Sequence, residues 1–169
     1  MSSNFVARPN GKFSGEGFTS RCVLGKGGVV TAGQKREGDG ASPAGKWPVR
    51  RVYFRPDRVK APKTLLPIVP LYPHDGWCDD PAHPLYNRPV SLPFAASHEK
   101  LWRDDQAYDL IVELGYNDDP VVPGRGSAIF MHVAKPGFTP TEGCVAMEKE
   151  DLLAVLELLQ PGSTIEIVF

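Results

Sequence analysis

The sequence contains no apolar run approaching the roughly 20 residues that a membrane-spanning helix needs, and it has no large charge excess of either sign. Its 19 basic and 20 acidic residues give a formal net charge of -1. Such a balance provides no electrostatic reason to expect nucleic acid or an anionic membrane as the main partner. We therefore expect no membrane span and no nucleic-acid binding, and the charge favours a small or neutral substrate.

Cysteine is also scarce. The three cysteines, Cys22, Cys78 and Cys144, are an odd number, and no two of them form a pair of the zinc or thioredoxin type. A disulfide scaffold is therefore not expected, and Cys22 is interpreted as a small buried hydrophobic residue. A metal site built from His74, Cys78 and His83 matches no strong spacing pattern. We expect neither a metal nor an organic cofactor.

The first residues of the chain lack the features of a secretory signal. Residues 1–9 contain neither a basic region nor an apolar core, so the chain as written is expected in the cytoplasm. Its 169 residues are enough for one domain with a proper core and too few for two of ordinary size. We predict a single domain over residues 1–169.

Glycine and proline, in contrast, are abundant. The 17 glycines and 17 prolines make up about a fifth of the chain and indicate many turns and short elements, which favours a β-rich class. A hairpin is predicted from strands at 18–24 and 29–31, joined by the glycine-rich turn at 25–28. Further strands are predicted at 47–54, 108–114, 128–133 and 164–169, with a polar loop at 38–45 ahead of the first of them.

One helix is predicted near the end of the chain. Its first turn is acidic, from Glu148 to Asp151, which suits the helix dipole. Apolar residues then recur three and four positions apart, which indicates one buried helix face. They are Leu152, Val155, Leu156 and Leu159. Pro161 ends the helix, and we expect the strand at 164–169 to pack under it.

The middle of the chain is rich in proline. Residues 55–97 show almost no periodicity, and a loop of that length in a compact domain is usually a functional lid or binding loop. Within it, Trp77 and Tyr86 are predicted to wall a polar cleft. The segment 97–102 is predicted to form a short helical turn, with His98 as a surface histidine.

Residues 129–147 carry the clearest candidate chemistry. An apolar strand delivers His132, a turn-rich segment doubles the chain back, and Gly143 immediately precedes Cys144. A thiol is a strong nucleophile only as thiolate, and a neighbouring imidazole or a helix N-terminus lowers its pKa. The N–H groups of Gly143 and Cys144 are candidate oxyanion donors. No carboxylate is evident to orient the histidine, so a backbone carbonyl is the candidate third group.

Two blocks of sequence resemble signatures of the L,D-transpeptidase (YkuD-like) family, enzymes that remodel peptidoglycan stem peptides. Residues 141–147, Thr-Glu-Gly-Cys-Val-Ala-Met, follow a histidine strand and are similar to the family's Ser/Thr-x-Gly-Cys block. Residues 42–47, Ser-Pro-Ala-Gly-Lys-Trp, are similar to its upstream Thr-Pro-x-Gly-x-Phe signature. The resemblance covers most of the chain. It implies a mainly β fold, a β-sandwich of mixed sheets with one prominent helix after the cysteine.

The resemblance also implies a reaction. Cys144 would attack the carbonyl between the L-centre and D-Ala of a tetrapeptide stem, release D-Ala and hold the stem as a thioester. His132 would act as base and later as acid, and an amine acceptor would complete the transfer. The implied partner is a peptidoglycan stem peptide or muropeptide, with a carbapenem β-lactam as a candidate covalent inhibitor. The implied location is the cell envelope.

Two positions beside the thiol differ from many family members. Glu142 stands where many have His, and Ala146 stands where many have an Arg that would hold the active-site loop or a substrate carboxylate. The basic residues that could replace this Arg are Arg125, Lys135, Arg88 and Arg21. The predicted substrate-binding residues are Thr141, Glu142, Trp77, Tyr86 and Arg125.

Two alternative functions are open at this stage. The absent signal and the missing Arg favour an L,D-carboxypeptidase or other thiol hydrolase that trims cytoplasmic muropeptides. A protein of another class, a non-catalytic muropeptide-binding module, would use the same cleft. Only the presence of both His132 and Cys144 argues against the binding module.

Overall fold

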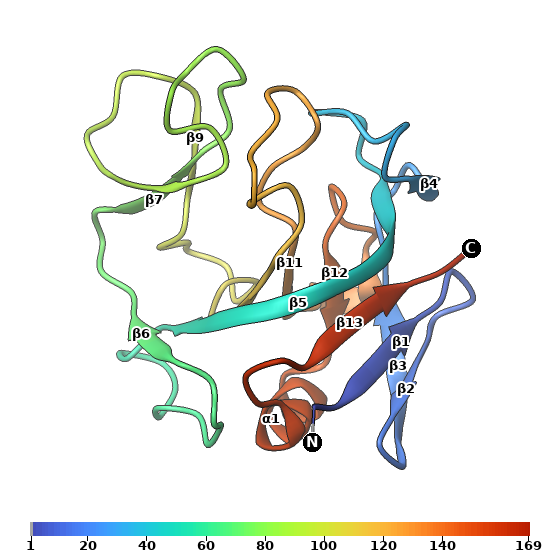
Figure 1. Cartoon of the computed structure of the whole chain (residues 1–169). Coiled ribbons are helices and arrows are strands. Elements are labelled where there is room, and N and C mark those ends of the chain that lie inside the picture. Colours follow the sequence, from blue (N-terminus) through green and yellow to red (C-terminus); the bar gives the residue numbers. More distant parts are fainter. Residues whose placement is uncertain (1) are drawn as a thin grey trace.

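The computed structural model of the chain describes residues 2–169. These residues form a mainly β fold with one α-helix, α1 (Lys149–Leu158) (Figure 1). The strands are β1 (Asn4–Ala7), β2 (Lys12–Gly15), β3 (Phe18–Val23), β4 (Val29–Thr31), β5 (Ser42–Phe54), β6 (Ile68–Pro70), β7 (Asp75–Cys78), β8 (Pro89–Ser91), β9 (His98–Lys100), β10 (Leu110–Leu114), β11 (Phe130–Val133), β12 (Val145–Met147) and β13 (Thr164–Ile167). A short 3₁₀ turn lies at Pro136–Phe138. No helix in residues 2–169 is long and apolar enough to cross a membrane.

The strands form two layers, and two strands, β5 and β3, take part in both layers. The order is β10-β11-β12-β3-β2-β1-β13-β5, and β5 also pairs with β10. The 13-residue β5 pairs with β13 through residues 45–48 and with β10 through residues 49–54. Strand β3 likewise pairs with β2 in one layer and β12 in the other. Because β1–β13 and β11–β12 are parallel and most other pairs antiparallel, the predicted β-sandwich of mixed sheets is confirmed.

The predicted helix and closing strand are also confirmed. Leu152, Val155 and Leu156 of α1 are fully buried, as their spacing on one helix face requires. They share one apolar core with Ile165 and Ile167 of β13. In Figure 1 the helix lies at the bottom of the view, below β5 and β13. The helix therefore closes one end of the sandwich.

The predicted hairpin at 18–31 is wrong. Strand β3 pairs with β2 and β12, whereas β4 pairs in parallel with β5. Residues 25–28 do form a tight turn, in which the Gly28 N–H donates to the Gly25 carbonyl at 2.9 Å, but the turn does not pair the two strands. Its glycines also permit close packing: a Cβ at Gly25 would lie 2.3 Å from the carbonyl oxygen of Gly40. The predicted loop at 38–45 is shorter than expected, because β5 begins at Ser42.

The proline-rich segment contains strands that its composition did not predict. Strands β6, β7 and β8 lie within residues 55–97, and the predicted helical turn at 97–102 is instead strand β9. Strands β8, β7 and β9 form a separate three-stranded sheet. Pro89 is tolerated because β8 is an edge strand. This small sheet lies at the upper left of Figure 1, away from α1.

Candidate active site

The parallel pair β11 and β12 brings the histidine and the cysteine to one face of the sheet. His132 is the register partner of Ala146, and Cys144 precedes Ala146 by two positions. Because side chains two apart on an extended chain share a face, all three project to the same side. Each of them lines a cleft of about 420 Å³. The alternating residues, such as Met131 and Val145, belong to the main core instead.

The cleft is bounded by segments far apart in the sequence. One wall is the small sheet, which contributes Asp79 and residues of β9. The opposite wall contains the strand pair and the segment before Cys144. The lining residues are Lys35, Glu37, Gly38, Asp79, His98, Glu99, Arg103, Ala107, Tyr108, Ser127, Ala128, His132, Lys135, Thr139, Pro140, Thr141, Glu142, Cys144 and Ala146. The predicted surface histidine, His98, therefore lies on the cleft wall.

The His132 ring is buried and oriented by the backbone. Its Nδ1 lies 2.9 Å from the carbonyl oxygen of Val133, so Nδ1–H donates this bond and Nε2 is free to accept a proton. Tyr108 packs edge-on against the ring, with centroids 5.3 Å apart. Burial lowers the His132 pKa to about 4, and the positive charges of Arg103 and Lys135 act in the same direction. The imidazole is therefore neutral, as a general base must be.

The Cys144 thiol is buried and neutral in the resting structure. It donates to the Ala128 carbonyl at 3.1 Å and accepts from the Phe130 N–H at 3.4 Å. Burial and, to a smaller extent, the negative charge of Glu99 together raise its pKa to about 12. The expectation of a pKa lowered by a helix N-terminus is wrong, because β12 separates Cys144 from the start of α1 at Lys149. Proton removal must therefore accompany nucleophilic attack.

The two candidate oxyanion donors differ in availability. The Gly143 N–H donates to Thr141 Oγ1 at 3.1 Å, and the Thr141 hydroxyl donates to the Cys144 carbonyl at 2.7 Å. Within residues 2–169, no acceptor meets the Cys144 N–H. Gly143 has a φ of +133°, and a Cβ there would lie 2.7 Å from the Ala41 carbonyl oxygen. Only glycine fits this close approach.

Trp77 supports the thiol from behind the cleft wall. Its side chain is buried outside the lining, and its indole N–H donates to Asn87 Oδ1 at 2.9 Å. The same oxygen accepts from the Ala128 N–H at 3.0 Å. Ala128 adopts a left-handed φ of 53°, a conformation that costs energy in a non-glycine residue. The resulting orientation presents the Ala128 carbonyl to Cys144.

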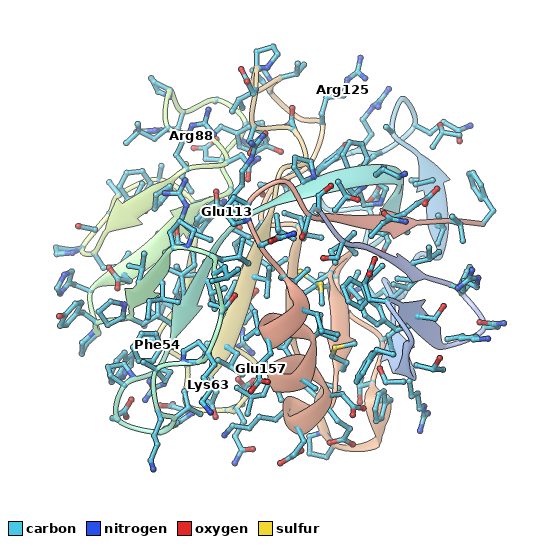
Figure 2. The ribbon with its side chains drawn as sticks, turned by 60° about the horizontal axis from the view of Figure 1, so that its bottom comes forward. Phe54, Lys63, Arg88, Glu113, Arg125 and Glu157 are labelled. Carbon is cyan, nitrogen blue, oxygen red and sulfur yellow. The ribbon has the colours of Figure 1, made fainter. Side chains whose placement is uncertain are left out.

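The other predicted substrate-binding residues divide between the cleft and the surrounding structure. Thr141 and Glu142 line the cleft, and the exposed Glu142 carboxylate pairs with Lys26 at 2.8 Å. Tyr86 is buried outside the lining, and its hydroxyl donates to Glu37 at 2.6 Å. Arg125 points outward at the top edge of Figure 2 and does not line the cleft.

The position of the family Arg is filled differently here. Ala146 is fully buried beneath the cleft. Among the four predicted replacements, Lys135 lines the cleft, whereas Arg21, Arg88 and Arg125 do not. The Lys135 side chain is exposed and makes no ion pair with residues 2–169. Lys135 is therefore the only one of the four predicted replacements that lines the cleft.

Sequence reasoning missed several polar side chains of the cleft. Glu99 and Tyr108 form a hydrogen-bonded pair, Arg103 is held by Asp105, and Lys35 is a buried lining residue. No local pattern marks them, because the small sheet and the loop before β10 meet only in the folded chain. The strand prediction at 108–114 was the one available signal for Tyr108.

Comparisons with known proteins show the family of the chain. Residues 8–167 match the family model of the L,D-transpeptidase catalytic domain, YkuD. The chain belongs to the YkuD family. L,D-transpeptidase 1 of Mycobacterium tuberculosis is similar, with 12% sequence identity, a TM-score of 0.45, and 99% of this chain and 60% of that chain covered. An L,D-transpeptidase from Mycobacterium smegmatis has 12% identity, a TM-score of 0.44, and coverage of 99% and 59%.

The YkuD domain accounts for nearly all of this chain but not for all of those solved proteins. The chain spans about three fifths of the length of the two mycobacterial structures. A comparison with curated proteins gave no match.

Proposed function

We propose that this YkuD domain is a cysteine-dependent L,D-transpeptidase that acts on peptidoglycan tetrapeptide stems through a Cys144 thioester. The observation that carries the proposal is the shared cleft of Cys144 and His132, which adjacent parallel strands present on one face. The Val133 carbonyl fixes the histidine tautomer that leaves Nε2 as an acceptor.

The first half of the reaction forms the thioester. His132 Nε2 takes the thiol proton while Cys144 Sγ attacks the carbonyl carbon of the bond to the terminal D-Ala. The Cys144 N–H, which has no acceptor within residues 2–169, donates to the oxyanion of the tetrahedral intermediate. The intermediate collapses as His132 returns the proton to the departing D-Ala nitrogen. The stem is then bound to Sγ as an acyl group.

The second half transfers the stem to an acceptor. An amine nitrogen attacks the thioester carbonyl, the C–S bond breaks, and a proton passes from nitrogen through His132 to the thiolate. An amide bond forms and the neutral thiol returns. If water attacks instead, the product is a shortened stem and the activity is that of an L,D-carboxypeptidase, the alternative that the sequence left open.

Lys135 suits recognition of the stem's carboxylates. Its ammonium group is exposed at the cleft, whereas Arg103 is occupied by Asp105 and Lys35 by Asp39. A charge-assisted hydrogen bond from Lys135 to a substrate carboxylate would supply part of the contact that the family Arg supplies elsewhere.

The proposal is tested by intact-mass analysis with a stem tetrapeptide. We expect an adduct equal to the tripeptide acyl group, exchange product when a D-amino acid is present, and no adduct on Cys144→Ala. Shortened stem without exchange product would identify a carboxypeptidase. Peptide binding without any adduct or turnover would identify a binding module and refute the proposal.

A further inference from the structure

One carboxyl group in the cleft has no part in the reaction proposed above. Glu99 lies on β9, directly paired with Trp77 of β7. Because directly opposed residues of antiparallel strands project to the same face, Glu99 points with Trp77 toward the body of the protein. The Trp77 ring packs edge-on against Phe130, with centroids 5.0 Å apart. Glu99 therefore lines the cleft from the wall opposite Cys144 and His132.

The Glu99 carboxylate has a hydrogen-bond donor but no cation. The Tyr108 hydroxyl donates to it. The nearby Arg103 guanidinium is instead forked onto Asp105, at 2.8 and 2.6 Å. Within residues 2–169, no lysine, arginine or histidine forms an ion pair with Glu99. A carboxylate on a cleft wall without a cation is a natural site for a ligand's ammonium group.

The surroundings make Glu99 a stronger base than an ordinary glutamate. Burial raises its pKa, and the charges of Asp79 and Glu37 act in the same direction. The Tyr108 hydroxyl and the charge of Arg103 oppose this rise. These groups come from the small sheet and its flanks, from the loop before β10 and from the segment before β5. All of them line the same cleft.

Glu99 works against the first half of the reaction, because its negative charge raises the pKa of the Cys144 thiol. A catalytic role for Glu99 would therefore belong to a later step. An acceptor amine arrives as an ammonium ion at neutral pH and cannot attack the thioester until it has lost a proton. His132 Nε2 is needed to protonate the departing thiolate, so this first proton requires another acceptor. The other carboxylates of the lining have partners of their own: Glu142 pairs with Lys26, Glu37 accepts from Tyr86 and Ser127, and Asp79 accepts from Ser97.

We propose that Glu99 binds the ammonium group of the acceptor and takes its first proton. The ammonium and the carboxylate become a neutral amine and a carboxylic acid. The amine nitrogen then bonds to the thioester carbon, the C–S bond breaks, and its second proton passes through His132 to sulfur. Glu99 releases its proton to solvent. This inference rests on the proposed transpeptidase function and assigns its acceptor as a positively charged amine.

The test compares two acceptors on the Cys144 thioester of Glu99→Gln. The amino group of D-methionine is mainly protonated at neutral pH, whereas hydroxylamine is mainly uncharged and needs no deprotonation before it attacks. We expect the variant to form the thioester, to lose roughly 10²-fold in the rate of transfer to D-methionine, and to react with hydroxylamine at the wild-type rate. Glu99→Asp, which retains a carboxylate, should recover part of the D-methionine rate.

Glu113→Gln is the matched control. Glu113 is also a partly buried carboxylate bonded to a tyrosine, Tyr53 at 3.0 Å, but it pairs with Arg51 and lies outside the cleft lining. Both acceptor rates should be unchanged in this variant. The inference would be overturned, and the proposed function left standing, by either of two results. Glu99→Gln could transfer to each acceptor at the wild-type rate, or it could lose the same factor in rate with both acceptors. Absence of a thioester in the wild-type protein would refute the proposed function and the inference with it.

Discussion

The Ser42 hydroxyl donates a 2.8 Å hydrogen bond to the carbonyl oxygen of Gly143. The same hydroxyl accepts from the Gly25 N–H at 3.0 Å. The carbonyl of Gly143 and the N–H of Cys144 belong to one planar trans peptide unit, in which they point in opposite directions. By holding the carbonyl, Ser42 therefore also fixes the direction of the proposed oxyanion donor. This contact links two sequence blocks that lie about 100 positions apart.

Ser42→Ala tests this link. The substitution leaves the buried Gly143 carbonyl and Gly25 N–H without their partner, so we expect a loss of about 1–3 kcal/mol in the free energy of unfolding. A misdirected Cys144 N–H should also lower the rate of thioester formation by about 10²-fold. Urea denaturation and stopped mass-spectrometric time courses measure the two effects. Ser42→Thr, which keeps the hydroxyl, is the control. An unchanged acylation rate in a folded Ser42→Ala protein would contradict the orienting role.

Local sequence patterns predicted much of this arrangement but not its electrostatics. The strand at 128–133 and the helix were predictable, because periodicity records which face of an element is buried. The contact of Ser42 with Gly143 and the pairing of β9 with β7 depend on partners distant in sequence. The thiol pKa was predicted in the wrong direction, because burial and the position of Glu99 arise only when the chain folds. The residue pattern and the family resemblance pointed to Cys144 and His132 as candidates, whereas their surroundings became known only from the fold.

His132 should make stability depend on pH. Its pKa falls from an ordinary 6.5 to about 4 in the folded protein. The unfolded chain therefore binds a proton that the folded state refuses, and stability is lost as pH falls from about 6.5 to 4. This group alone should account for about 3 kcal/mol. Urea denaturation at pH 7 and pH 4.5 measures the loss. His132→Gln should show a smaller loss, and His74→Gln, at an exposed histidine, the same loss as wild type. An equal loss of stability between pH 7 and pH 4.5 in all three proteins would contradict the assignment of this pH dependence to His132.

Lys135→Ala should weaken substrate binding without altering the chemistry. Its free ammonium group lines the cleft, and a lost charge-assisted hydrogen bond costs about 1.5–3 kcal/mol. We expect KM for the stem peptide to rise roughly 10- to 100-fold while kcat changes little. Lys63→Ala is the control, because Lys63 is exposed (Figure 2) and lies outside the cleft lining. A fall in kcat at constant KM would instead assign Lys135 to the chemical step.

The alkylation rate of the Cys144 thiol gives a second measure of the electrostatic effect of Glu99, and this measurement needs no substrate. The negative charge of Glu99 raises the pKa of Cys144, so Glu99→Gln should increase the thiolate fraction at any pH below that pKa. A fall of one pKa unit would increase the alkylation rate by about tenfold.

Neutral iodoacetamide, with the Cys144 peptide followed by mass spectrometry, measures this rate without interference from Cys22 or Cys78. Glu113→Gln should react at the wild-type rate. Because a damaged fold would also expose the buried thiol and slow transfer, the comparison requires that the variant keep the wild-type urea denaturation midpoint and the wild-type hydroxylamine rate. An unchanged or slower alkylation would contradict the electrostatic coupling across the cleft.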